Sequence, residues 1–237
     1  MTPPLRRVNW PKTYRIIRSI HPPIDLFEDI ADPADWEALA SAEAKFNPRL
    51  RHAIGDLAKL PPARRVSGPG ATWVNAPFVH CSRLRPGRFS DGSYGLYYAG
   101  NREGVALAET IYHHSRFMHA TAEPAGWTSD FRMLIGQIDH DLHDVTGRAD
   151  VLHPDDYAAS QQLGAALRAA GSDGLVWPSL RDLGGQCIGI FWPDVITIPV
   201  QGSHFCYHWN GAQVDYIKRL DTGQVLQVEN APQPGQL

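Results

Sequence analysis

Three polar side chains of different types follow one another at short intervals within residues 78–117. Arg88 comes directly after Gly87 in a segment rich in turn-forming residues, Tyr98 follows ten residues later, and Glu109 eleven residues after that. A turn, a strand and a helix in this order can bring three such side chains to one cleft. The group would combine a permanent cation, an aromatic face and a carboxylate.

These side chains suit a ligand that carries phosphates, a flat ring and a sugar. The guanidinium of Arg88 is a planar donor fork that matches a pyrophosphate, and Tyr98 offers a ring on which a nicotinamide can stack. Glu109 can accept hydrogen bonds from ribose hydroxyls, and its negative charge would stabilise an oxocarbenium-like transition state at the anomeric carbon. The three residues therefore fit cleavage of the nicotinamide–ribose bond of a pyridine dinucleotide.

Each residue also has a simpler interpretation. Arg88 alone could pair with a surface carboxylate, and Tyr98 alone could be a core aromatic of a strand. Glu109 alone could be a solvated helix residue, although residues 106–108 before it are all apolar. His113 lies one helical turn from Glu109, so it is either a surface residue or a border of the same cleft. The hypothesis of a site requires that these side chains lie together.

The elements expected around these residues predict an α+β fold of twisted sheets with flanking helices over residues 71–220. Short apolar runs between Gly, Pro and Asp indicate strands, and apolar residues at helical spacing indicate helices. Strands are expected at residues 95–99, 133–138, 174–177, 187–191 and 195–200, and helices at residues 103–117 and 157–170.

Residues 1–70 are expected to form an N-terminal arm and a helical extension. Residues 1–23 are rich in Pro and Arg, which predicts an irregular arm with a short strand at residues 14–18. Asp32 and Pro33 would cap and open a first helix. The apolar and acidic positions of that helix are Trp36, Leu39, Ala40 and Glu43. A second helix is expected at residues 48–60, a linker at residues 61–70, and a flexible tail at residues 221–237.

The run GRF…YYAG…ALAE resembles the RES domain, a family named for an Arg, a Glu and a Ser. Family members have a Gly-Gly-Arg-aromatic turn, a Tyr-containing strand and an Ala-Leu-x-Glu helix start. Arg88, Tyr98 and Glu109 match these positions in the same order, and Ser179 matches the Ser. The resemblance extends over roughly residues 73 to 200, with one departure, because Pro86 replaces the first Gly of the turn.

The resemblance implies a core similar to that of the diphtheria-toxin-like ADP-ribosyltransferases. It also implies a cytoplasmic toxin of a bacterial type II toxin–antitoxin pair that uses NAD as substrate without a metal. Arg88, Tyr98 and Glu109 would be catalytic, and Arg88, Tyr98 and Ser179 would bind the NAD. The acceptor would be water, phosphate or a protein, and one branch of the family modifies phosphoribosyl pyrophosphate synthetase. The partner would be an Xre/ParS-like antitoxin whose C-terminal part blocks the site.

Composition restricts the other classes of function. The formal net charge of -3 and the pI of about 6.4 argue against direct nucleic-acid binding. Three cysteines give no disulfide framework, which is typical of the reduced cytoplasm. Neither a secretory signal nor an apolar run long enough to span a membrane is visible.

Two alternatives from other classes remain open at this point. One is a non-catalytic module that binds a nucleotide or an antitoxin. The other is a metal-dependent hydrolase that uses either the Asp- and His-rich run 139–144 or the alternating His204, Cys206 and His208. Neither run has a standard zinc spacing, so a solvated loop and an ordinary strand are the simpler interpretations.

Overall fold

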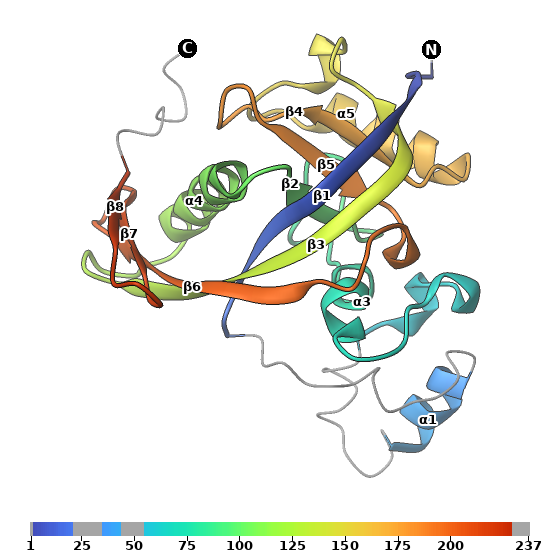
Figure 1. Ribbon diagram of the computed structural model, residues 1–237, viewed down its shortest axis with the longest axis horizontal. Helices are drawn as coiled ribbons and strands as arrows, with labels where there is room; N and C mark the ends of the chain where they lie inside the picture. Colours follow the sequence, from blue (N-terminus) through green and yellow to red (C-terminus); the bar gives the residue numbers. More distant parts are fainter. Residues whose placement is uncertain (1, 21–34, 44–54, 229–237) are drawn as a thin grey trace.

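The computed structural model describes residues 2–20, 35–43 and 55–228. It confirms the mixed α+β class, with one large sheet and helices on both of its faces (Figure 1). The strands are β1 (Leu5–Arg18), β2 (Tyr97–Gly100), β3 (Thr128–Asp144), β4 (Gly174–Pro178), β5 (Gln186–Ile190), β6 (Val200–Trp209), β7 (Val214–Arg219) and β8 (Val225–Gln227). The α-helices are α1 (Trp36–Glu43), α3 (Ala71–Val79), α4 (Glu103–His119) and α5 (Ala158–Ala169). Short 3-10 turns are η2 (Leu57–Lys59), η3 (Pro62–Arg64), η4 (Ala149–Val151) and η5 (Pro193–Val195).

The sheet has the strand order β1-β2-β5-β4-β3-β6-β7-β8, and β1 also pairs with β3. The strands β1-β2-β5-β4-β3 therefore form a closed ring, because β1 at one end pairs with β3 at the other. The strands β6, β7 and β8 extend the sheet from β3. The long strand β3 belongs to both parts, because residues 128–135 pair with β6 and residues 143–144 pair with β4. Figure 1 shows β3 and β1 running together through the centre of the molecule.

Strand β1 corrects the prediction of an irregular arm at residues 1–23. It pairs antiparallel with β3 from Leu5, opposite His143, to Arg18, opposite Phe131. The register shifts between Trp10 and Thr13, where Pro11 interrupts the strand. A proline lacks the N–H that a ladder needs, so it is tolerated at such an irregularity. The strand was hidden in the sequence because of this proline and because most of its side chains are polar.

Side chains along the central strands alternate between the two faces of the sheet, and each face carries its own apolar cluster. On one face, Tyr97 and Ala99 pack in a cluster with α1, α3 and β1. On the other face, Trp177 and Cys187 pack with Phe89, and Tyr98 lies against this second cluster. Successive side chains of a strand point to opposite faces, so one short strand supplies both clusters. The second face is the one that carries the candidate site residues.

Helix α4 confirms the helix predicted at residues 103–117, and it packs against β1 and the part of the sheet formed by β3, β6 and β7. Its partly buried Leu107 and Ile111 pack against the cluster that contains Phe131 and Tyr207. Gly100, just before the helix, has no room for a side chain, because a Cβ there would lie 2.6 Å from a side-chain carbon of Val105. The start of α4 therefore fits tightly against the end of β2, which fixes the side of the helix that faces the site.

The N-terminal extension packs on the first face. Trp36 at the start of α1 is only 1% exposed, and Arg65 lies over its ring at 5.7 Å. Helix α1 confirms the helical spacing at Trp36, whereas the predicted cap at Asp32 and Pro33 lies outside the described residues. The second predicted helix is described only from residue 55, where it is the short turn η2.

Three further differences concern α3, the segment before β6 and the C-terminal segment. Helix α3 forms where no helix was predicted, even though Pro77 lies inside it. The strand predicted at residues 195–200 is wrong, because the 3-10 turn η5 and irregular backbone occupy this segment and β6 begins at Val200. The tail predicted at residues 221–237 contains the short strand β8, and residues 229–237 lie outside the described part. None of the helices in the described ranges is long and apolar enough to cross a membrane.

Candidate functional site

Glu109 and Ser179 are in direct contact although 70 residues separate them. Glu109 lies on α4, and Ser179 begins the loop that follows β4. The hydroxyl of Ser179 donates to Oε1 of Glu109 at 3.0 Å. Ser179 is 4% exposed, and its oxygen also accepts the backbone N–H groups of Arg181 at 3.2 Å and Asp182 at 3.1 Å. The loop therefore fixes the hydroxyl, and the hydroxyl in turn orients the carboxylate.

Cys187 on β5 also faces the same carboxylate oxygen. Its Sγ is 3.7 Å from Oε1 of Glu109. Burial, and then the negative charge of Glu109, raise the pKa of the thiol well above its ordinary value. A neutral thiol can donate a weak hydrogen bond. Two donors thus converge on Oε1, whereas neither of them bonds Oε2.

Arg88 is held in its turn by the beginning of α5. The Ser160 hydroxyl donates to the carbonyl of Arg88 at 2.6 Å, and the Gln161 amide donates to the carbonyl of Gly87 at 3.0 Å. The guanidinium lies 4.6 Å above the ring of Tyr157, and its Nη1 donates to the carbonyl of His153 at 2.6 Å. Arg88 is therefore fixed by backbone and aromatic contacts, and at 9% exposure it is a buried cation.

Tyr98 supports the turn that carries Arg88. Its hydroxyl oxygen accepts the backbone N–H of Phe89 at 3.1 Å. A Cβ on Gly87 would lie 2.8 Å from the same oxygen, so only glycine lets the turn approach this closely. Burial raises the pKa of Tyr98 to about 12, so the hydroxyl stays neutral. The ring is partly exposed and meets Trp177 edge-on at 6.2 Å between centroids.

His113 connects the arginine part of the site to the carboxylate part. Its Nε2 lies 3.8 Å from Oε2 of Glu109, one helical turn away. Desolvation, followed by the positive charges of Arg181, Arg116 and Arg88, lowers the pKa of His113 below its ordinary value, although 53% of the side chain is exposed. The imidazole is therefore neutral near pH 7 and adds no positive charge beside Glu109. In the described part of the chain, no ion pair joins Arg88 to Glu109, and the charge of Arg88 acts on the histidine beside that carboxylate.

The structure thus brings Glu109 and Ser179 into contact, and it places Tyr98 of β2 against the turn that carries Arg88. His113 was considered as a border of the site from its spacing to Glu109, whereas Cys187 and Arg181 were not predicted to lie there. Arg181 lies over the ring of Tyr112 at 3.5 Å, next to His113. The position of Arg181 two residues after Ser179 was the only signal in the sequence, and it does not reveal the contact with α4.

The two runs considered as metal sites are part of the sheet. Residues 139–144 end β3, where His140 bonds Asp173 at 2.8 Å, and in β6 His208 bonds Asp215 at 2.6 Å. Within the described ranges, no group of three or more His, Cys, Asp or Glu side chains could hold a metal ion.

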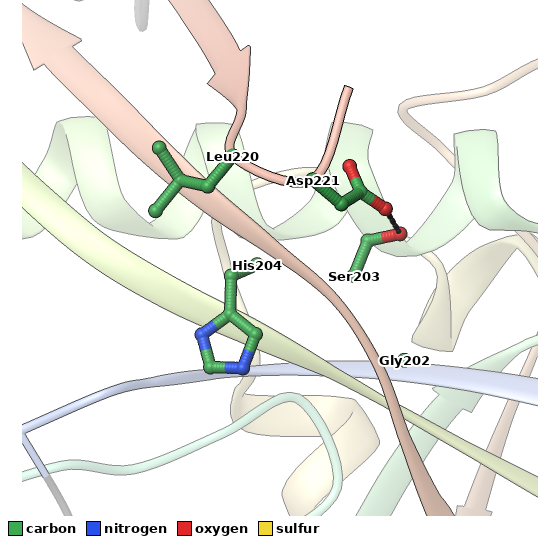
Figure 2. A pocket seen from close by; sticks show the side chains of 5 residues that line it. All are labelled: Gly202, Ser203, His204, Leu220 and Asp221. Carbon is green, nitrogen blue, oxygen red and sulfur yellow. Dashed lines mark hydrogen bonds between the residues drawn. The ribbon is translucent and has the colours of Figure 1, made fainter. Parts of the chain in front are cut away.

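An open hollow lies elsewhere on the molecule, between β6 and the turn after β7. Figure 2 shows its lining, in which the Ser203 hydroxyl donates to Asp221 at 2.7 Å and Leu220 and His204 face the opening. None of the candidate site residues lines this hollow. Its exposed, mainly apolar surface offers no group of convergent charges, so the side chains around Glu109 remain the better candidate site.

Comparison with known proteins gives three findings. The family model of the RES domain matches residues 62–210. An uncharacterized protein, y4oC, of Sinorhizobium fredii is 29% identical over 216 residues, which cover 88% of this chain and 87% of that protein. Among solved structures, the M. tuberculosis MbcT–MbcA toxin–antitoxin complex contains a chain with 15% identity and a TM-score of 0.37, over 50% of this chain and 69% of that one.

Proposed function

Because this chain belongs to the RES-domain family, we propose that it binds NAD and cleaves the nicotinamide–ribose bond as the toxin of a toxin–antitoxin pair. In this reaction the C–N bond between the ribose and the nicotinamide breaks, and the bonding electron pair leaves with the nicotinamide. The resulting carbocation is captured by an acceptor that loses a proton. The cleavage step needs stabilisation of positive charge at the anomeric carbon, and a fixed carboxylate provides it.

Each side chain of the site has a role in this proposal. Glu109 stabilises the cationic transition state through Oε2, and Ser179 holds the carboxylate through Oε1. Arg88 binds the pyrophosphate, and Tyr98 offers the exposed part of its ring to the nicotinamide while it holds the Arg88 turn. His113 is neutral and does not cancel the charge of Glu109.

The observation that carries the proposal is the contact between Ser179 and Glu109. These are two of the three residue types that give the family its name, and their side-chain oxygens lie 3.0 Å apart. The buried hydroxyl of Ser179 needs an acceptor, and its bond to Oε1 fixes the orientation of the partly exposed carboxylate. The neutral His113 beside the other oxygen supports the same interpretation.

The proposal also concerns the acceptor of the ADP-ribosyl group, the antitoxin and the protein target. Water, phosphate or a protein side chain can capture the same carbocation, and a protein acceptor would make the reaction ADP-ribosyl transfer. An Xre/ParS-like antitoxin would be the partner. Phosphoribosyl pyrophosphate synthetase is one target to test, because a branch of the family modifies it.

The decisive experiment is nicotinamide release from NAD by the wild type and by Glu109→Gln. Glutamine keeps the size of the side chain but removes its charge, so we expect the rate to fall about 100-fold or more, with a much smaller change in NAD affinity. Asp150→Asn is the matched control, because it removes a carboxylate that pairs with Arg148 on the surface. Wild-type turnover in Glu109→Gln would remove Glu109 from the mechanism. NAD binding without nicotinamide release by the wild type would instead favour a non-catalytic binding module.

A further inference from the structure

Arg181 is fixed beside the candidate site by contacts from two elements. Its guanidinium lies 3.5 Å above the ring of Tyr112 on α4, and its Nη2 donates to the carbonyl of Pro154 at 2.8 Å. The backbone N–H of Arg181 donates to the hydroxyl oxygen of Ser179. The side chain is therefore held in one position by the same loop that orients Glu109.

Arg88 bonds the same loop as Arg181, although it comes before that loop in the sequence and Arg181 comes after it. Its Nη1 donates to the carbonyl of His153, the residue directly before Pro154. Both guanidinium groups therefore bond the backbone of one loop between η4 and α5. The positive charges of both arginines also act on His113, which lies 3.8 Å from Glu109. Both cations therefore act on the histidine that lies beside the carboxylate.

Neither of these cations is neutralised by an acidic side chain. Within the described ranges, no carboxylate lies within 4.0 Å of Arg88 or Arg181, whereas Arg83 pairs with Asp91 at 2.7 Å. Asp155 belongs to the same loop, but its carboxylate accepts the hydroxyl of Tyr112 and lies 3.9 Å from Arg116 instead. Each of the two arginines uses one of its five N–H groups on a backbone carbonyl, so most of the donors remain available.

We infer that Arg88 and Arg181 together form one site for a phosphoryl anion, and that its ligand is the diphosphate of a nucleotide. A buried cation without a counter-charge is unfavourable, and an anionic ligand would supply the charge that the protein lacks. Two planar forks on neighbouring elements suit two linked phosphates better than one compact anion. The identification of the ligand as a dinucleotide rests on the proposed function, whereas the anion site depends only on the two arginines.

The test measures the binding of ADP by calorimetry to the full chain. A charge-assisted hydrogen bond contributes enough for roughly a 10- to 100-fold change in affinity. We therefore expect Arg181→Gln to weaken ADP binding at least 10-fold, and Arg181→Lys to weaken it less because the charge remains. Arg83→Gln is the matched control, because Arg83 lies in the turn that leads to Arg88 but is already paired, and its affinity should equal that of the wild type. Adenosine, which has no phosphate, should bind equally to all variants.

Thermal unfolding of each variant separates loss of the site from loss of the fold, and Arg181→Lys keeps the cation over Tyr112 if the glutamine variant unfolds. ADP affinity that is unchanged in both Arg181 variants would overturn the inference. Orthophosphate distinguishes the source of the anion: competition with ADP assigns the site to the diphosphate, whereas binding beside ADP assigns it to a free phosphate and overturns the identification of the ligand. Arginine-dependent ADP binding without nicotinamide release would refute the proposed activity and leave the anion site intact.

Discussion

Replacement of Ser179 by alanine tests whether the carboxylate of Glu109 must be oriented. The hydroxyl makes a 3.0 Å bond to Oε1 and is almost completely buried, so water cannot easily replace it. Without it, Oε1 keeps only the thiol of Cys187 at 3.7 Å, which is a weak donor. The glutamate would then be free to rotate away from the reacting carbon.

The expected size of the effect follows from the type of bond. Hydrogen bonds to charged groups contribute about 1.5 to 3 kcal/mol. If this orientation is needed only in the transition state, kcat should fall roughly 10- to 100-fold, and the KM for NAD should change little. Ser179 also accepts two backbone N–H groups, from Arg181 and Asp182, so the free energy of unfolding should fall by about 1 to 3 kcal/mol.

The assay is the initial rate of nicotinamide release at a series of NAD concentrations, with urea unfolding of the same preparations. Cys187→Ala is the matched comparison, because it removes the longer and weaker donor to the same oxygen. It should lower kcat only a few-fold. A Ser179→Ala enzyme with wild-type kcat, in a protein whose Glu109→Gln variant is inactive, would refute the role of Ser179 in orienting Glu109.

Two other predictions concern stability and inhibition. Burial lowers the pKa of His114 to about 4, so below pH 6.5 the unfolded chain binds a proton that the folded chain does not. The stability that neutral His114 contributes is present above pH 6.5 and is lost as the pH falls toward 4, by roughly 3 kcal/mol. Phenylalanine in place of His114 should lessen the fall in the free energy of urea unfolding between pH 7 and pH 4, and equal falls in both proteins would contradict this. An antitoxin that blocks the site should offer a carboxylate to Arg88, compete with NAD and bury more than roughly 1,000 Å². Deletion of its inserted segment should restore nicotinamide release, and an intact complex as active as the free protein would exclude occlusion.

The elements next to the site were predictable because their signals are local. Helix α4 follows from apolar residues at helical spacing, and α5 ends at Ala169, shortly before Gly171, which has a φ of 80°. Strand β1 was not predictable as a full strand, because Pro11 and many polar side chains hide a pairing that only β3 reveals. Pairing partners that are far apart in the sequence leave no local trace.

The same difference applies to the residues of the site. Arg88, Tyr98 and Glu109 follow one another closely, so their order and spacing could be compared with a family motif. Ser179 could be matched only through the resemblance, and its bond to Glu109 crosses 70 residues. Arg181 and Cys187 have no motif of their own, and their roles depend on the packing of the loop after β4 and of β5 against α4. Side-chain packing of this kind is decided by the tertiary structure.

The pairing of β1 with β3 also affects when the protein can fold during synthesis. Leu5 cannot pair until His143 has been synthesised. Strands β2 and β4 both pair with β5, which is synthesised only at residues 186–190. At about 5 to 20 residues per second, the ribosome needs roughly 9 to 34 seconds after the end of β1 to produce the end of β5. Long-range strand pairing is slow to form in any case. A growing chain therefore has no assembled site, and if the protein is a toxin, its antitoxin has this interval to meet it before the first turnover.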